Sequence, residues 1–249
     1  MTSPYEGMWR ELGLDLEAHD QLLSVLGQGY QAVFLSQENR PKSMEYFDFV
    51  MSEVHGLRVK ELVDGKKNGA PVVGAYCVFV PEELVRAAGA VLVGLCTGAD
   101  FALDQVEALL PRNTCALIKS ALGFKLGKVC PYLESADLIV GENTCDGKKK
   151  AYETLSGLVP RMQVMDLPQM KSAEGRALFK AEYYKLMAEL EALTGRKITA
   201  DGLRAAIGLV NFDLHGAGFC QFGMSGGQWQ GSQRQQGEAG KAFVHSKNG

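Results

Sequence analysis

The sequence lacks the features that mark several large classes of protein. None of its six cysteines forms a C-x-x-C pair, so neither a zinc ribbon nor a thioredoxin-like redox centre is indicated. It has no G-x-G-x-x-G or Walker A motif, so nucleotide binding by this chain is not indicated. It also has no excess of charge: a net charge of −3 over 249 residues argues against nucleic acid or an anionic membrane as the partner.

Long apolar runs are absent as well. Even the longest apolar runs, such as residues 87–95, are too short to cross a bilayer. Residues 1–16 carry acids and polar groups where a signal peptide needs a basic start and an apolar run. We therefore expect a soluble cytoplasmic protein without a membrane partner, in a reducing compartment that disfavours disulfides.

The chain divides into four segments of different character. Residues 1–70 have apolar residues at helical spacing, with a stop at Gly56 and a loop at residues 65–69. Residues 71–170 alternate short apolar runs with helical segments. Residues 171–211 contain two long helices, the second starting near Thr199 and ending near Val210. Residues 212–249 hold nine Gly and six Gln but one Leu and no Ile, which predicts a disordered or frameshifted tail.

The second segment predicts a parallel sheet. Apolar runs at residues 71–77, 90–95, 136–140 and 162–167 are strand candidates, and helices are expected at residues 81–88 and 146–158. Strand, helix and strand in this order form βαβ units, which imply a small parallel sheet flanked by helices. The fold class is thus α/β: N-terminal helices followed by a Rossmann- or flavodoxin-like half-domain.

Five cysteines gather in this segment, and their placement is informative. Cys77 ends the first strand, Cys96 follows the second, and Cys145 lies between the third strand and a helix. These loops meet at the carboxyl edge of a parallel sheet, where open α/β folds bind ligands. Cys115 and Cys130 bracket an insertion that folds over the same edge. Converging thiolates suit a soft metal centre, either an iron–sulfur cluster or zinc.

The strongest local signal is the run from Gly141 to Lys150. A thiolate at a helix N-terminus, here Cys145, is stabilised by free backbone N–H groups and the helix dipole. The lysines at 148–150 either add positive potential beside this thiolate or form a solvated helix face. Both interpretations remain open at this point.

This run resembles a motif of the 2-hydroxyacyl-CoA dehydratase and benzoyl-CoA reductase subunit family. The resemblance covers roughly residues 10–211 and is closest to the double-cubane cluster protein branch. It is carried by the T-C-D-G-K-K-K motif at residues 144–150 and by four further motifs: Y-C-V-F-V-P-E-E at 76–83, L-C at 95–96, P-R-N-T-C at 111–115 and C-P-Y at 130–132.

The resemblance implies a cysteine-bound iron–sulfur cofactor, [4Fe-4S] or double-cubane [8Fe-9S], in an oxygen-sensitive protein of anaerobic metabolism. It implies ATP-coupled, low-potential electron transfer to a CoA thioester or a small molecule. The electrons come from a separate dimeric ATP-hydrolysing iron–sulfur activator, and the protein pairs with itself or with a related subunit. Its ligand candidates, in order, are Cys145, Cys96, Cys130, Cys115 and Cys77, with Cys77 expected to be merely buried.

Family members continue with a second half-domain, so the resemblance also predicts that the C-terminal half is missing here. This keeps two alternatives open: a non-catalytic metal-binding or electron-carrying module, and an inactive gene fragment.

Other titratable residues receive structural interpretations. His19 and His55 are lone histidines on predicted helices, and a structural or surface role is favoured for both. Glu82 and Glu83 suit the first turn of a helix. Glu142 lies near a strand end, where a carboxylate can take part in proton transfer.

Overall fold

The computed structural model describes residues 3–216, with the backbone alone for 212–216. The remainder of the predicted tail, residues 217–249, lies outside the described residues, as do Cys220 and His245. The chain divides into two compact units, Met1–Ile198 and Thr199–Gly249, which are described separately.

The first 70 residues are helical, as predicted. The π-helix η1 follows α2 without a break, because Tyr30 is still in helical backbone conformation. Gly56 directly precedes α4, so it separates two helices as expected. The elements are α1 (Glu6–Glu11), α2 (Leu16–Tyr30), η1 (Gln31–Leu35), α3 (Met44–Ser52) and α4 (Leu57–Lys67).

The predicted loop at residues 65–69 is mostly helical, which corrects the prediction. Helix α4 continues to Lys67, and only Asn68 and Gly69 turn away. Lys66 and Lys67 lie in the last turn, where cations interact well with the exposed carbonyls. Gly69 ends the helix with a φ of 82°, a left-handed conformation that glycine adopts without strain.

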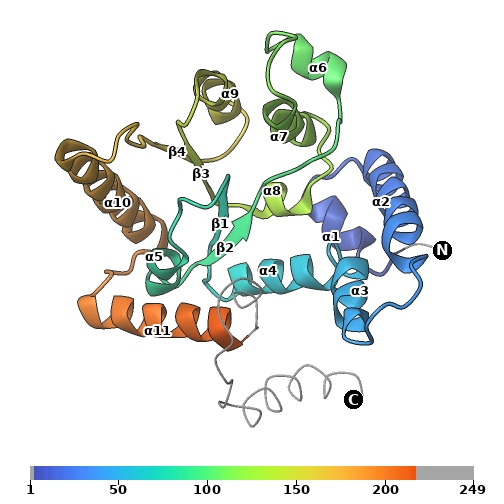
Figure 1. The fold of residues 1–249 in the computed structure, drawn as a ribbon, viewed down its shortest axis with the longest axis horizontal. Coiled ribbons are helices and arrows are strands. Elements are labelled where there is room, and N and C mark those ends of the chain that lie inside the picture. Colours follow the sequence, from blue (N-terminus) through green and yellow to red (C-terminus); the bar gives the residue numbers. More distant parts are fainter. Residues whose placement is uncertain (1–2, 217–249) are drawn as a thin grey trace. The chain divides into compact units, whose positions relative to one another are not determined.

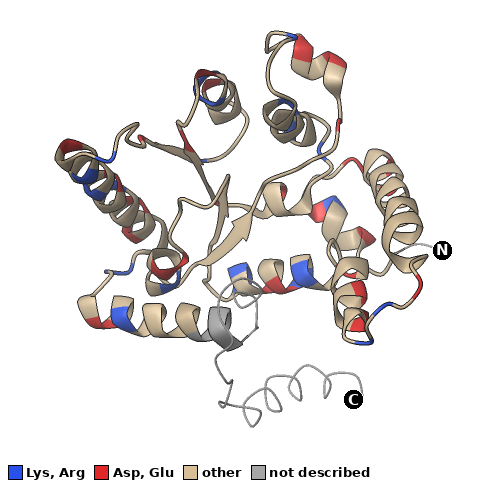
Figure 2. Cartoon of the chain, viewed as in Figure 1, with Lys and Arg blue, Asp and Glu red and all other residues tan. Residues whose placement is uncertain are grey.

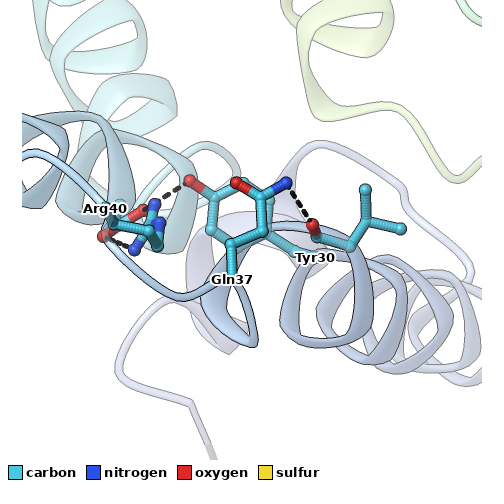
Figure 3. A network of polar contacts seen from close by, with 5 residues as sticks. Tyr30, Gln37 and Arg40 are labelled. Carbon is cyan, nitrogen blue, oxygen red and sulfur yellow. Dashed lines mark hydrogen bonds and ion pairs between the residues drawn. The ribbon is translucent and has the colours of Figure 1, made fainter.

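A polar network ties α2 to α3 (Figure 3). The Tyr30 hydroxyl donates to Asp48 Oδ1 over 2.6 Å, and the Arg40 guanidinium forms two bonds to the same carboxylate, at 2.6 and 2.8 Å. Gln37 is held separately, since its amide donates to the Val33 carbonyl. Hydrogen bonds from Arg40 and Tyr30 lower the pKa of Asp48 to about 2.

This network predicts a specific acid response. A carboxyl whose pKa is lower in the folded state stabilises the fold above its ordinary pKa, and this stabilisation disappears as pH falls toward the folded value. Stability measured by urea unfolding should therefore fall between the ordinary pKa of 3.8 and about 2. Asp48→Asn should remove this component of the pH dependence, whereas Asp64→Asn, at an exposed i,i+4 pair with Lys60, should leave most of it. Identical pH profiles for wild type and Asp48→Asn would contradict the assignment.

The sheet has four parallel strands in the order β2-β1-β3-β4, which confirms the α/β prediction. The strands are β1 (Val72–Ala75), β2 (Val91–Gly94), β3 (Leu138–Glu142) and β4 (Met162–Met165). The chain leaves β1 toward β2 on one side and continues through β3 to β4 on the other. The carboxyl ends of β1 and β3 therefore flank the topological switch point, where open α/β sheets bind ligands.

Helices cover the sheet on both faces (Figure 1). Helix α5 (Glu82–Ala87) connects β1 to β2, and α10 (Ala173–Thr194) packs against α5 and β4. Helix α9 (Asp146–Ser156) connects β3 to β4, and α7 (Ala116–Leu126) packs against it. Helix α8 (Pro131–Ser135) packs on β1 and α4. A right-handed crossover places α5 and α9 on opposite faces of this sheet.

Two short helices were not predicted, α8 and α6. Helix α6 (Leu103–Glu107) precedes α7 and packs against it. Its Ala102 has a φ of 48°, and its five residues are too few to show a helical period in the sequence.

The second unit contains α11 (Ala200–Gly216). Its N-cap is Thr199, as predicted: the Gly202 N–H donates to the threonine hydroxyl over 3.1 Å. The helix continues past the predicted end near Val210, through the backbone of Gly216.

Candidate functional site

Three thiols lie at the carboxyl edge of the sheet. Cys77 follows β1, Cys96 follows β2 and Cys145 follows β3, and all three are exposed. Burial raises the pKa of Tyr152, and the electrostatic influence of all three cysteines raises it further. The structure therefore brings Cys77, Cys96 and Cys145 around one tyrosine, as the strand order requires.

Cys77 and Cys96 interact directly. The Cys77 backbone N–H donates to Cys96 Sγ over 3.3 Å. Cys77 has a φ of 66°, a left-handed conformation that costs a non-glycine residue about 1 kcal/mol. The turn that carries Cys77 thus presents a backbone N–H donor to the sulfur of Cys96.

The expected burial of Cys77 is wrong, and Cys130 is the buried thiol. The buried run that contains β1 ends one residue after the strand, at Tyr76. Cys77 lies in the exposed turn beyond it. Cys130 directly precedes the Pro131 start of α8, inside the main apolar core. Burial raises the pKa of the Cys130 thiol to about 11, so it resists the deprotonation that metal binding needs.

Three of the five thiols directly precede helices. Cys115, Cys130 and Cys145 are the N-cap residues of α7, α8 and α9. Cys115 is exposed, and no hydrogen bond within the described residues joins it to the edge thiols. A Cβ on Gly147 would lie 2.9 Å from Ile118 Cδ1 and 3.9 Å from Cys145 Sγ, so the first turns of α7 and α9 approach closely beside Cys145.

The thiols fit a soft-metal cofactor by their chemistry, because sulfur donors exposed at one edge are the ligands that iron–sulfur clusters use. In the part of the chain that the structure describes, no three His, Cys, Asp or Glu side chains lie close enough together to hold a metal ion. Among these residues, likewise, no helix has the length and apolarity needed to cross a membrane.

Glu142 lies beneath the thiols and was only partly anticipated. Strand β3 extends two residues beyond its predicted end, so Glu142 is in the strand and its side chain is 2% exposed. It is the one charged residue in the four strands. Figure 2 accordingly shows the sheet as almost entirely tan. The Lys148 ammonium and, over 3.3 Å, the Tyr152 hydroxyl both donate to its carboxylate.

The three lysines of the motif have different roles. Lys148 turns inward to Glu142, whereas Lys149 and Lys150 are exposed and pair with Asp146 and Glu153 on the same helix. The solvated-face interpretation therefore describes Lys149 and Lys150. Since each of these three lysines pairs with an acidic residue, the positive potential expected beside Cys145 is largely compensated.

Glu82 is a structural residue, as predicted. It pairs with Arg86 one turn along α5, over 2.6 Å, and both Glu82 and Glu83 lie in the first turn of that helix.

The histidines are not isolated, contrary to expectation, although their role is structural. His19 Nε2 lies 2.9 Å from His55 Nδ1 and the rings stack. Trp9 packs edge-on against His19 and donates its indole N–H to the His55 carbonyl over 2.7 Å. Tyr132 packs against His55 and donates to the Val54 carbonyl. This cluster links α1, α2 and α8 with the turn between α3 and α4 that carries His55, and its Tyr132 lies two residues after Cys130.

A small pocket opens beside the edge thiols, between α7 and α9. Its volume is about 170 Å³, and its lining includes Tyr76, Cys77, Cys96, Lys148 and Tyr152. Cys145 is not among the lining residues. The pocket therefore joins two of the candidate ligands to an apolar space that the sequence alone did not reveal.

Comparison with known proteins supports the resemblance carried by the motifs. Residues 77–213 match the family described as 2-hydroxyglutaryl-CoA dehydratase, D-component. The chain is 48% identical over 161 residues to YjiM of Escherichia coli (strain K12), which is named as a dehydratase subunit; the match covers 64% of this chain and 42% of the relative.

Two further relatives belong to acyl-CoA enzymes by name. The (R)-phenyllactyl-CoA dehydratase beta subunit of Clostridium sporogenes is 26% identical over 169 residues, covering 67% of this chain and 44% of the relative. A benzoyl-CoA reductase subunit of Thauera aromatica is 30% identical over 148 residues, covering 56% and 36%. The aligned part of the chain spans less than half the length of each relative.

Proposed function

Because the chain belongs to the 2-hydroxyglutaryl-CoA dehydratase D-component family, we propose that it is an iron–sulfur-dependent subunit acting in reduction or dehydration of a CoA thioester. The observation that carries the proposal is the set of exposed thiols, Cys77, Cys96 and Cys145, around the carboxyl edge of the sheet. A bound cluster would supply one-electron chemistry at low potential.

The edge thiols are the first ligand candidates. Cys96 combines exposure with a backbone N–H donor, and Cys145 combines exposure with the free N–H groups at the start of α9. Cys115 is a further candidate because it is exposed at the start of the adjacent helix α7. Cys130 ranks last, since ligation would require its buried thiol to ionise in the apolar core.

The protein's own groups would shape such a site in two ways. The Cys77 N–H hydrogen bond lowers electron density on the Cys96 sulfur, and hydrogen bonds to sulfur are one means by which proteins set cluster potentials. Glu142 holds Lys148 and Tyr152 at the base of the edge, so the helix that follows Cys145 is fixed on the strand that precedes it.

The proposed partners follow from the kind of protein this chain resembles. All three relatives are named as subunits, which supports pairing with a related chain. We further propose a separate ATP-hydrolysing iron–sulfur activator as the electron source and the cytoplasm as the location. The phenyllactyl-CoA and benzoyl-CoA in two of those names support an acyl-CoA substrate for the assembled protein.

Anaerobic reconstitution tests the cofactor. The 249-residue chain, incubated with iron and sulfide, should bind both, and Cys96→Ser should weaken iron binding by at least about tenfold, because a sulfur bound directly to iron is lost. Cys130→Ser is the matched control and should retain iron. Iron and acid-labile sulfide analysis with EPR spectroscopy provides the readout.

Three outcomes would contradict the proposal. A wild-type chain that binds no iron under these conditions would remove the cofactor. Iron loss on Cys130→Ser but not on Cys96→Ser would move the site away from the sheet edge. Iron binding without any acyl-CoA reduction or dehydration in the presence of an activator would favour an electron-carrying module instead.

A further inference from the structure

The pocket between α7 and α9 has an almost entirely apolar wall. Four residues come from one turn and a half of α7 and two from α9, and all six are aliphatic: Leu117, Ile118, Ala121, Leu122, Ala151 and Leu155. Such a wall favours an apolar ligand group, because burying apolar surface is the main gain on binding.

The polar groups of the lining are mostly engaged with each other or with neighbours. Lys148, the cation among the described lining residues, is paired with Glu142, and Tyr152 donates to the same carboxylate. The Thr97 hydroxyl bonds to Ser120 over 2.7 Å. A ligand carboxylate or phosphate would find no unpaired cation among these described residues, so burying that charge would be costly. The pocket therefore favours an uncharged ligand group.

One buried polar atom at the pocket has no protein partner. Tyr76 lines the pocket and is 5% exposed, and its hydroxyl has no hydrogen bond among the described residues. An unsatisfied buried hydroxyl is unfavourable, and a ligand carbonyl oxygen is the kind of acceptor that would relieve it.

The volume limits the size of the ligand group. At about 170 Å³ the pocket is close to cavities of about 150 Å³ that hold benzene. It therefore has room for a group of roughly six non-hydrogen atoms. The two thiols in the lining, Cys77 and Cys96, place that group beside the proposed cofactor site.

From these observations we infer that the pocket is an acyl-binding subsite for a short, uncharged acyl group. The assignment of the bound group as substrate rests on the proposed function, whereas occupancy of the pocket does not. The small side chains of Ala121 and Ala151 set the limit on acyl size, because each leaves space that a larger residue on α7 or α9 would fill.

Protein-observed NMR with small probes tests the subsite on the 249-residue chain without iron. Isobutyramide represents a short uncharged acyl group, glutarate an acidic one and 3-phenylpropionamide a larger one. Isobutyramide should shift the amide resonances of the pocket residues of α7 and α9 and bind at least tenfold more tightly than either of the other probes.

Matched alanine-to-leucine variants on one helix locate the binding. Ala121→Leu fills the pocket and should weaken isobutyramide binding at least tenfold, whereas Ala116→Leu, exposed and outside the lining, should leave it unchanged. Ala121→Val is the second variant in case the leucine perturbs folding, which the dispersion of the spectrum reports. It should weaken binding to an intermediate extent.

Several results would overturn the subsite: no shifts with isobutyramide, equal binding of glutarate, or equal binding by the Ala121 and Ala116 variants. A different result would contradict the cofactor proposal. A chain that binds isobutyramide as described yet never takes up iron would leave a short-acyl binding pocket and remove its role in reduction.

Discussion

Replacing Lys148 with alanine is expected to lower the free energy of unfolding by about 3 kcal/mol, because it leaves a buried carboxylate without its cation. The Glu142 side chain is 2% exposed and accepts from Lys148 and Tyr152. Tyr152 continues to donate after the substitution, which is why the expected loss lies at the lower end for a broken buried pair. Urea unfolding at neutral pH measures the change.

The same motif supplies the control. Lys150 is 63% exposed and pairs with an exposed Glu153, so Lys150→Ala should change stability by no more than about 0.5 kcal/mol. The double variant Glu142→Leu/Lys148→Met replaces both charges and should recover most of the loss, since a buried ion pair often contributes little net stability over apolar packing. Equal losses for Lys148→Ala and Lys150→Ala would show that Glu142 is not the buried partner.

A second large effect is expected from acidification of the histidine pair. Burial, with a smaller contribution from the neighbouring His19, lowers the pKa of His55 to about 4, and burial lowers the pKa of His19 as well. The unfolded chain then binds more protons than the folded one between the ordinary value of 6.5 and about 4. The stability that the neutral histidines contribute is therefore fully present above this window and is lost as pH falls through it.

For His55 alone, a pKa moved from 6.5 to about 4 corresponds to about 3 kcal/mol of stability. Urea unfolding across this pH range should show the loss in wild type. His55→Gln keeps a polar side chain without a titratable ring, so it should be less stable at neutral pH but lose much less on acidification. Asp48→Asn is the contrasting variant, because the pH dependence of stability that it removes lies below this window. A wild-type stability that stays flat from neutral pH to about 4 would contradict the buried, neutral pair.

The parallel sheet could be predicted because its strands are short apolar runs separated by helical segments with clear start and stop residues. Val72–Ala75 is buried throughout, and such a run has few alternatives in a protein of this size. The gathering of Cys77, Cys96 and Cys145 at one edge followed from the direction of parallel strands alone.

Features that depend on tertiary packing could not be predicted. Burial of Cys130 and exposure of Cys77 are decided by the left-handed turn after Tyr76 and by where α8 meets the core. The pairing of His19 with His55 joins residues 36 apart in the chain. The inward turn of Lys148 depends on the strand continuing to Glu142, two residues beyond the end of the apolar run.

The three N-cap thiols have a consequence for backbone opening. Cys115, Cys130 and Cys145 precede α7, α8 and α9, so a ligand held by any two of them would join the starts of two helices. By thermodynamic linkage, ligand binding would then add its free energy to the cost of opening each bridged helix. Amide hydrogen exchange in the first turns of those helices would slow together, and the protection of α10 would stay as it was.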